Sequence, residues 1–302
     1  MLIVSLPPVH QEDLLKEIIT HPCVGAVRYN TGMSSAYPPV EVIQRIQKLA
    51  EPLGKTIWID LKGRQLRVIE WANLPYGPIV LNHRVKVKLP AKVCFRGDDC
   101  CELKEVVDGN KLYVDPLPKA PVGRGQSVNI LSEKLEVEGG LLSLDYEYID
   151  VAVQNRVFNF MLSFVEGWDN ILELEDALGK HRSKSTIYLK IESQAGLDFV
   201  FQNDISLLKG YRLMAARDDL MIQIGILNMN KSLNMIIKKD TKAICASRIL
   251  MSLESGSVSM ADVSDLEYML SLGYKDFMLS DGISREHFPA AIKFWEEWNS
   301  SL

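Results

Sequence analysis

GAVRYNTGMSSAYPPVEVIQRIQKLAEPLGKTIWIDL, residues 25–61, joins two short apolar runs through a helical pattern. In the helical part, residues 38–54, apolar side chains recur three and four positions apart and the pattern closes on a glycine. The flanking runs are short and rich in β-branched residues, as is typical of buried strands. A strand–helix–strand order of this kind predicts parallel strands.

The same order recurs along the chain. The eight apolar runs are LIVSL (2–6), GAVRYN (25–30), KTIWIDL (55–61), VFNFML (157–162), TIYLKI (186–191), YRLMAA (211–216), KAICAS (242–247) and KDFMLS (275–280). Eight strand–helix repeats favour an α/β fold closed as a (β/α)8 TIM barrel over an open doubly wound sheet.

The repeat is interrupted between residues 70 and 140. There, the runs VKVKL (85–89), AKVCF (91–95), ELKEVV (102–107) and KLYVDPL (111–117) alternate apolar and polar residues, and Asp108-Gly109 provides a hairpin turn. We therefore expect a small all-β domain at 70–140, inserted after the third strand. The barrel is then discontinuous, formed by 1–69 and 141–302, with the insertion as a mobile lid.

Composition limits the classes of function. The chain has 302 residues and a net charge of -5, without a stripe of Lys and Arg, so a nucleic-acid polymer is not an expected partner. No apolar stretch is long enough to span a membrane, and the first residues lack the basic leader of a signal peptide. Cys23, Cys94, Cys100, Cys101 and Cys245 show no paired CxxC spacing, which predicts reduced thiols in a cytoplasmic protein.

Charged and polar side chains gather where the predicted strands end. Active sites of such barrels lie at the C-terminal ends of the strands. The candidates there are Arg28, Asn30, Asp60, Lys62, Arg67, Lys190, Glu192, Asp219 and Ser247. A single charge at a strand end is often only solvated, but the convergence of acids, arginines and a lysine on one rim indicates a site.

The residue types suit phosphoryl chemistry. Lys190 and Glu192 are two residues apart, so they face the same side of their strand. Glu192 and Asp219 end neighbouring strands and can provide oxygen ligands for Mg²⁺ or Mn²⁺. Arg28 and Arg67 match phosphate oxygens through the guanidinium fork. A lysine beside the phosphoryl group would offset its developing charge.

The strand ends also resemble a known family. The order VRYN, IDLKGRQLR, SVNIL, LSFV, YLKIES, AARDDL, AICASRIL, ADVSD and FMLSDG is similar to the motifs RxNFSHG, DTKGPEIR, KGVNLPG, LSFVR, KIE, ARGDLG, CATQMLES, RAEVSD and IMLSGETA of pyruvate kinase, a glycolytic phosphotransferase. The matches are collinear over almost the whole chain, and the inserted β-domain falls where the family has one. The resemblance covers neither the family's N-terminal helical arm nor its C-terminal effector-binding domain, so neither is expected here.

The resemblance implies a role for each matched residue. Arg28 and Arg67 match phosphate-binding arginines, Glu192 and Asp219 the divalent-metal ligands, Lys190 the lysine beside the transferring phosphoryl group, Asn30 and Asp60 two potassium ligands, Ser247 a threonine near the path of proton delivery, and Asp115 a lid aspartate that closes over the nucleotide. Phosphoenolpyruvate and ADP or ATP are the implied ligands.

Several positions depart from the family pattern. Gly32 and Leu61 replace potassium ligands, Met33 replaces a histidine on the nucleotide side, and Asp218 and Met221 replace glycines near the substrate carboxylate. Gln65 stands where potassium-dependent members have Glu and some potassium-independent members have Lys. We therefore expect little potassium binding, weakened nucleotide contact, and repulsion of an anionic substrate by Asp218.

Three functions are consistent with these residues. The first is weak or altered Mg²⁺-dependent phosphoryl transfer between phosphoenolpyruvate and ADP, or a related reaction of a pyruvate-like acid. The second is a metal-dependent lyase or aldolase acting on pyruvate-like enolates. The third is a non-catalytic paralogue that acts as a partner. The first two functions act on a phosphorylated or keto-acid small molecule. A homo-oligomer is compatible with all three functions.

Overall fold

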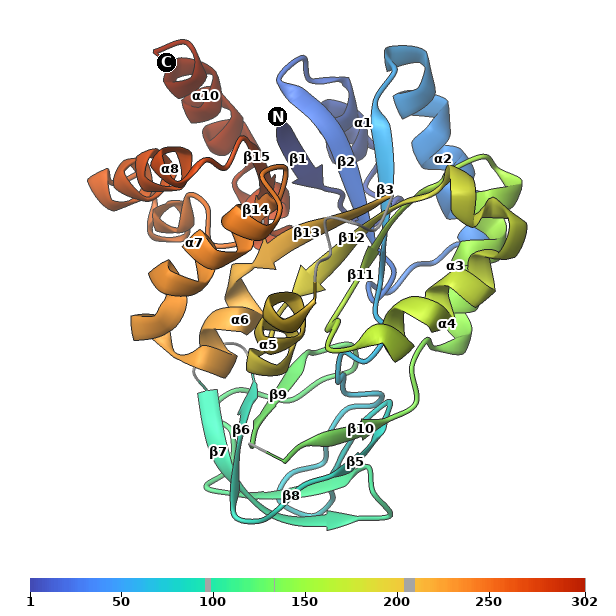
Figure 1. The fold of residues 1–302 in the computed structure, drawn as a ribbon, viewed down its shortest axis with the longest axis vertical. Coiled ribbons are helices and arrows are strands. Elements are labelled where there is room, and N and C mark those ends of the chain that lie inside the picture. Colours follow the sequence, from blue (N-terminus) through green and yellow to red (C-terminus); the bar gives the residue numbers. More distant parts are fainter. Residues whose placement is uncertain (96–98, 133, 204–209, 302) are drawn as a thin grey trace.

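Eight parallel strands close into a barrel in the computed structural model of the chain, with helices packed around it (Figure 1). The structure describes residues 1–95, 99–132, 134–203 and 210–301. The order of strands around the barrel is β1-β15-β14-β13-β12-β11-β3-β2, and every neighbouring pair is parallel. The predicted fold class is confirmed.

All eight predicted apolar runs supply a barrel strand. The strands are β1 (Leu2–Ser5), β2 (Val24–Asn30), β3 (Thr56–Leu61), β11 (Asn159–Leu162), β12 (Thr186–Ile191), β13 (Tyr211–Ala216), β14 (Ile244–Ala246) and β15 (Asp276–Leu279).

Helices follow the strands and bury one face each against them. They are α1 (Glu12–Thr20), α2 (Pro39–Ala50), α3 (Ser143–Gln154), α4 (Trp168–Leu178), α5 (Gln194–Gln202), α6 (Arg217–Ile224), α7 (Met229–Lys239), α8 (Met260–Leu272), α9 (Asp281–Glu286) and α10 (Phe288–Asn299). Within the described ranges, every helix is too short or too polar to cross a bilayer.

The inside of the barrel is filled by a separate apolar cluster to which every strand contributes. Its members are Ile3, Ala26, Trp58, Met161, Tyr188, Met214, Ile244, Ala246 and Met278. Because side chains two apart lie on the same face of a strand, the next inward positions belong to the polar residues at the strand ends. Two positions further along their strands, Arg28 follows Ala26, Asp60 follows Trp58, and Lys190 follows Tyr188. The strand period therefore places the candidate site directly above the apolar interior.

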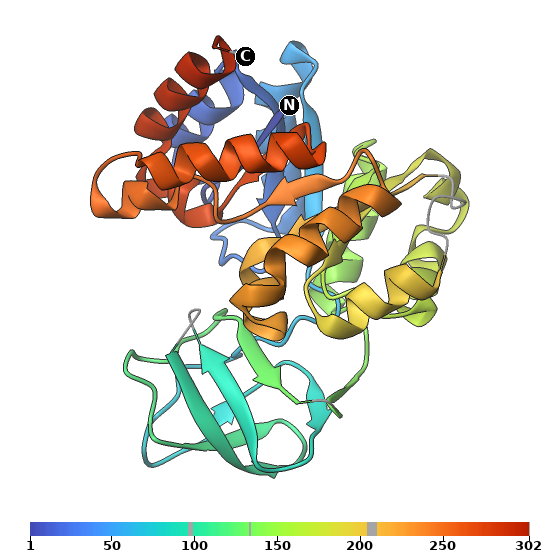
Figure 2. The same cartoon turned by 60° about the vertical axis from the view of Figure 1, so that its left-hand side comes forward.

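The inserted segment forms β-structure with its own apolar cluster. Five strands pair antiparallel in the order β4-β8-β7-β6-β9, and β5 pairs with β10. These strands are β4 (Ile79–Val80), β5 (Arg84–Lys86), β6 (Ala91–Phe95), β7 (Asp99–Val107), β8 (Lys111–Asp115), β9 (Val128–Leu131) and β10 (Glu136–Glu138). Figure 2 shows the segment beside the barrel, with β9 near α6. Leu66 and Val68 belong to its apolar cluster, while the boundaries 70 and 140 stay a prediction.

One expectation about the cysteines is wrong. Cys94 and Cys100 form a disulfide between β6 and β7, whereas Cys23, Cys101 and Cys245 are free thiols. The reason is the register of the hairpin, which places Cys94 directly opposite Cys100 across the antiparallel pair. Sequence spacing alone gave no sign of this pairing.

Candidate active site

A cavity of about 850 Å³ lies at the C-terminal ends of the barrel strands. It brings together most of the residues that the sequence singled out: Arg28, Asn30, Lys62, Arg67, Lys190, Glu192, Asp219 and Ser247 all line it. The inserted segment closes one side with Lys92, Cys94, Cys100, Ser127 and Leu131. The strand ends and the insertion therefore share one cavity.

Below the cavity lies a set of buried charges that we call the Asp60 cluster, consisting of Arg28, Asp60, Lys62 and Lys190. Asp60 is fully buried. Its Oδ2 accepts from Arg28 Nε at 2.9 Å and from Lys62 Nζ at 3.1 Å, and its Oδ1 accepts from Lys190 Nζ at 3.4 Å. Three cations therefore share one carboxylate.

The charges in this cluster control one another's protonation. Burial disfavours the Asp60 carboxylate, but Arg28, Lys190 and Lys62 outweigh burial and hold its pKa well below the ordinary value. Burial lowers the pKa of Lys62 to about 7, although Asp60 opposes this shift. Burial also acts on Lys190, but there Asp60 and Glu192 prevail and raise the pKa of its ammonium. The pKa values of the two lysines are thus shifted in opposite directions.

Asp281 was missed by the sequence analysis. At the start of α9, it accepts from Arg28 Nη1 at 2.6 Å and from Asn30 Nδ2 at 2.9 Å. Arg28 is therefore held between two carboxylates, those of Asp60 and Asp281. The signal was present, because Asp281 directly follows the eighth apolar run, where a site residue is expected.

Lys190 and Glu192 face the cavity side by side, as their spacing predicted. Lys190 Nζ lies 3.1 Å from Glu192 Oε1 and donates to Ser163 Oγ at 2.8 Å. The Phe164 amide donates to Glu192 Oε2 at 2.7 Å. Burial raises the pKa of Glu192, Lys190 lowers it, and the charge of Asp219 raises it further. The two predicted metal-site acids are therefore close enough to repel each other.

Around Asp219 lies a second group, the Asp219 junction, formed by Gln65, Arg67, Asn129 and Asp219. Asp219 Oδ1 accepts from Asn129 Nδ2 at 2.8 Å, and Oδ2 accepts from Gln65 Nε2 at 3.3 Å. Gln65 Oε1 in turn accepts from Arg67 Nε and Nη2 at 3.0 and 2.9 Å. Asn129 belongs to β9, so a residue of the insertion contacts a predicted metal ligand.

The expected repulsion by Asp218 is reduced by an ion pair. Arg248 Nη1 lies 3.3 Å from Asp218 Oδ1, and both residues line the cavity. The two side chains therefore partly neutralise each other. Burial, followed by the nearby Asp219, nevertheless raises the pKa of Asp218, with Arg248 acting against them.

The segment after β14 is held in an unusual backbone conformation. Ser247, Arg248 and Leu250 have φ values of 65°, 54° and 58°, a region that costs energy for residues other than glycine. Arg217 Nε and Nη2 donate to the Ser247 carbonyl at 3.0 and 2.8 Å, which fixes this segment. Ser247 and Arg248 are thereby placed at the cavity wall.

Three departures from the family pattern have visible structural counterparts. A Cβ on Gly32 would lie 2.8 Å from Arg67 Cζ, so the guanidinium occupies the space of a larger side chain. Leu61 is buried in the core between barrel and helices, and Met33 packs against that same core. Asp115 is exposed on β8, opposite Glu102, and lies outside the set of residues lining the cavity.

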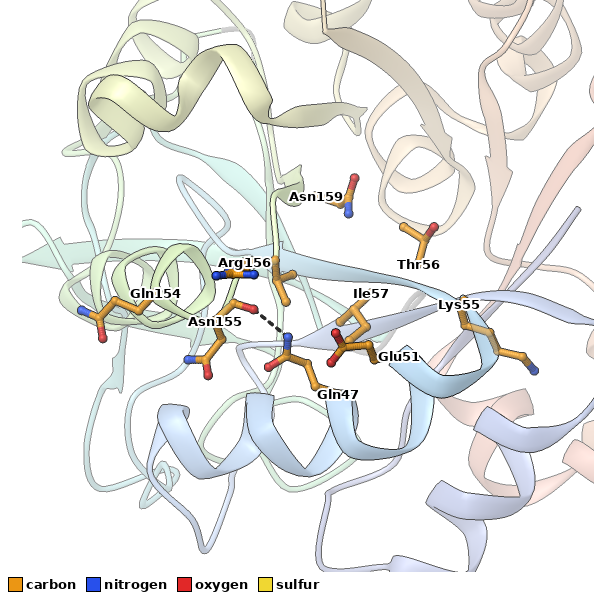
Figure 3. Close-up of a pocket in the computed structure, with 11 residues that line it drawn as sticks. Gln47, Glu51, Lys55, Thr56, Ile57, Gln154, Asn155, Arg156 and Asn159 are labelled. Carbon is orange, nitrogen blue, oxygen red and sulfur yellow. Dashed lines mark hydrogen bonds between the residues drawn. The ribbon is translucent and has the colours of Figure 1, made fainter.

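A second, smaller cavity of about 430 Å³ lies near the opposite end of the barrel strands (Figure 3). It is lined by the start of β3 and by the segment between α3 and β11, and Gln47 Nε2 donates to the Asn155 carbonyl across it. None of the predicted site residues lines it. Because barrel enzymes place their chemistry at the C-terminal ends of the strands, the first cavity is the candidate active site.

Comparison with known proteins agrees with this geometry. The pyruvate kinase barrel domain matches residues 94–292, which is more than half of the chain. The chain therefore belongs to the pyruvate kinase family.

Individual relatives are distant and longer than this chain. Pyruvate kinase 2 of Candida glabrata is 28% identical over 211 residues, which cover 68% of this chain and 41% of that protein. Pyruvate kinase 2 of Saccharomyces cerevisiae is 26% identical over 235 residues, covering 74% and 43%. Pyruvate kinase of Staphylococcus epidermidis is 22% identical over 322 residues, covering 95% and 54%. The chain thus spans about half the length of the curated relatives it matches.

Proposed function

We propose that this chain binds Mg²⁺ or Mn²⁺ together with a phosphorylated enol acid such as phosphoenolpyruvate, and that it transfers the phosphoryl group to ADP at a low rate. The observation that carries the proposal is the meeting of Lys190, Glu192, Arg67 and Asp219 around one cavity. Phosphoryl transfer depends mainly on positioning and on neutralising charge. This set provides both.

The acids of the cavity fit a hard divalent cation. Burial raises the pKa of Glu192, and the negative charge of Asp219 raises it further, so the two carboxylates repel each other. Asp219 accepts hydrogen bonds from the neutral amides of Asn129 and Gln65, and neither amide neutralises its charge. Two such carboxylates suit Mg²⁺, which keeps several waters and takes further oxygen ligands from a substrate. When bound, the ion would neutralise charge on the phosphoryl oxygens.

The other residues would bind and orient the substrate. Lys190 provides a fixed ammonium beside the phosphoryl group, because Asp60 and Glu192 keep it protonated. Arg67 provides a guanidinium suited to phosphate oxygens. Ser247 offers a hydroxyl at the cavity wall for the proton that an enolate takes up. These roles are proposals for this chain.

Two arrangements support a low rate. Arg28 is engaged by Asp60 and Asp281, so its guanidinium has less capacity left for a phosphate than a free arginine would have. Asp115, which the resemblance assigns to the nucleotide, is exposed outside the cavity wall. Misplacement of binding groups can lower rates by orders of magnitude.

The activity test uses phosphoenolpyruvate, ADP and Mg²⁺ with the purified chain. We expect weak turnover that Lys190→Met abolishes and that Lys55→Met leaves unchanged, because Lys55 lines the cavity at the opposite end. Turnover that survives Lys190→Met would contradict the assignment, and a rate like that of an ordinary pyruvate kinase would show that the departures were overweighted.

The metal test is independent of turnover. Glu192→Ala and Asp219→Ala should each weaken Mn²⁺ binding at least tenfold in a calorimetric titration, whereas Asp276→Ala, at the start of β15, should not. Unchanged Mn²⁺ affinity in both cavity variants would overturn the metal site.

A second candidate, a metal-dependent lyase or aldolase acting on pyruvate-like enolates, is favoured by the position of Asp115. It needs the two acids and an arginine but no nucleotide contact. Thermal shifts with Mn²⁺ distinguish the candidates, since a ligand of the native state raises Tm. Stabilisation by oxalate or pyruvate without stabilisation by ADP would favour the lyase, and no shift with any ligand would favour a non-catalytic partner protein.

A further inference from the structure

Asn129 is the residue through which the insertion contacts the proposed metal site. Its side chain is buried at the end of β9 that faces α6. Nδ2 donates to Asp219 Oδ1 at 2.8 Å, and Oδ1 accepts from Gln223 Nε2 at 2.9 Å. Both ends of the amide are therefore engaged by residues of α6 in the barrel.

The other oxygen of Asp219 is linked back to the insertion by a second route. Gln65 donates to Asp219, accepts from Arg67, and Arg67 Nη1 donates to the Gly125 carbonyl at 2.5 Å. A glutamine suits this position because it can donate to a carboxylate and accept from a guanidinium at the same time. A Glu would lack the donor and a Lys would lack the acceptor. Asp219 is thus held from both oxygens by groups that depend on the docked insertion.

We propose that Asn129 is a positioning residue of the metal site, contributed by the insertion, and that docking of the insertion and orientation of Asp219 are one equilibrium. This inference rests on the proposed function, in which Asp219 is a metal ligand. Hydrogen-bond partners of metal-binding carboxylates fix their orientation, and their loss typically weakens metal binding by about 10- to 100-fold. Asn129 fulfils this role only while the insertion is docked.

The coupling acts in both directions. If docking raises the affinity of the site for a metal, the metal must favour docking by the same factor, because binding equilibria are linked reciprocally. When the insertion moves away, Asp219 loses the Asn129 donor. The site is then complete only in the closed form, as expected for a lid that excludes water from phosphoryl transfer.

Two measurements on the full chain test the inference. The first is Mn²⁺ affinity, measured by calorimetry or electron paramagnetic resonance. The second is the distance, in the metal-free protein, between spin labels on Tyr113 of the insertion and Leu172 of the barrel, both of which are exposed. The second readout reports docking without any metal.

Asn129→Leu keeps the size of the side chain but removes both hydrogen bonds. We expect its Mn²⁺ dissociation constant to rise at least tenfold and the distance between the two labels to lengthen. The matched control is Asn110→Leu, because Asn110 bonds only within the insertion, to the Leu81 carbonyl. This control should change neither measurement at the junction.

Gln223→Met provides a second variant, on the barrel side, that cannot disturb folding of the insertion. The substitution removes the hydrogen bond to the side-chain oxygen Oδ1 of Asn129 and leaves Asp219 itself intact. We therefore expect a threefold or larger loss of Mn²⁺ affinity. If the wild type binds Mn²⁺ and neither Asn129→Leu nor Gln223→Met weakens the binding, the inference about Asn129 is overturned but the proposed metal site is not. Absence of Mn²⁺ binding by wild type would overturn the proposed metal site and the inference with it.

Discussion

The Asp60 cluster and the Asp219 junction border one cavity, yet they are built differently. The four residues of the Asp60 cluster come from β2, β3, the segment just after β3 and β12, so the barrel alone assembles it. The Asp219 junction combines α6, the connection into the insertion, and β9. The Asp60 cluster is therefore assembled within the barrel, whereas the Asp219 junction needs Asn129 from the insertion.

The largest effect should come from removing the central acid of the barrel side. Asp60→Asn leaves three buried cations without their shared carboxylate, and breaking a buried pair in this way costs about 3 to 5 kcal/mol. We expect the free energy of unfolding in urea to fall by that amount. Asp276→Asn is the control, because its partly exposed pair with the N-terminal amine should contribute under about 1 kcal/mol.

The pH dependence of stability checks the same group. Since the folded pKa of Asp60 lies well below 3.8, the unfolded chain binds the proton more tightly. The stability from Asp60 is therefore complete above about pH 4 and is lost as pH falls further. The difference in stability between wild type and Asp60→Asn should shrink below pH 4. A difference that stays constant down to pH 2 would contradict the buried ion cluster.

Removal of the insertion should weaken the Asp219 junction and leave the Asp60 cluster in place. Replacing 70–140 with a short linker is feasible because the two connections meet at Asp145, whose carboxylate accepts from the amides of Lys62 and Gly63 at 2.8 and 3.0 Å. The barrel should still unfold cooperatively. Its stability should fall by about 3 kcal/mol, from exposure of Leu66 and Val68.

In the protein without the insertion, we expect Mn²⁺ affinity to fall at least tenfold. The effect of Asp60→Asn on the pH dependence of the free energy of unfolding should persist. Far-ultraviolet circular dichroism and urea unfolding measure the fold, and calorimetry measures the metal. A chain that fails to fold would show that the insertion is part of the barrel core, and that the predicted boundaries are misplaced.

The smallest effect concerns potassium. Arg67 occupies the space beside Gly32, and Leu61 is buried in the apolar core, so two positions that the resemblance assigns to potassium offer no side-chain oxygen. Replacing Na⁺ by K⁺ at constant ionic strength should change the rate with phosphoenolpyruvate and ADP less than twofold. A robust potassium activation would mean that Asn30 and Asp60 still hold the ion.

The strand ends show how far sequence reasoning reaches into the site. Lys190 and Glu192 were placed side by side from their spacing, because the period of a strand is two. Asp281 was accessible to the same reasoning, because it directly follows the eighth apolar run, but it was overlooked. Asn129 lies in the motif SVNIL, which the resemblance singled out, but its contact with Asp219 was not accessible, because no pattern within the insertion indicates which of its residues faces the barrel.

Sequence by itself determined the barrel, the insertion after the third strand and the set of strand-end residues, because hydrophobic periodicity and chain order are local properties. Tertiary structure alone decided the disulfide of Cys94 with Cys100, the capture of Arg28 by Asp281, the pairing of Asp218 with Arg248 and the contact of Asn129 with Asp219. These contacts join residues by strand register and by docking of the insertion. Both depend on three-dimensional packing, which the local pattern of a sequence does not encode.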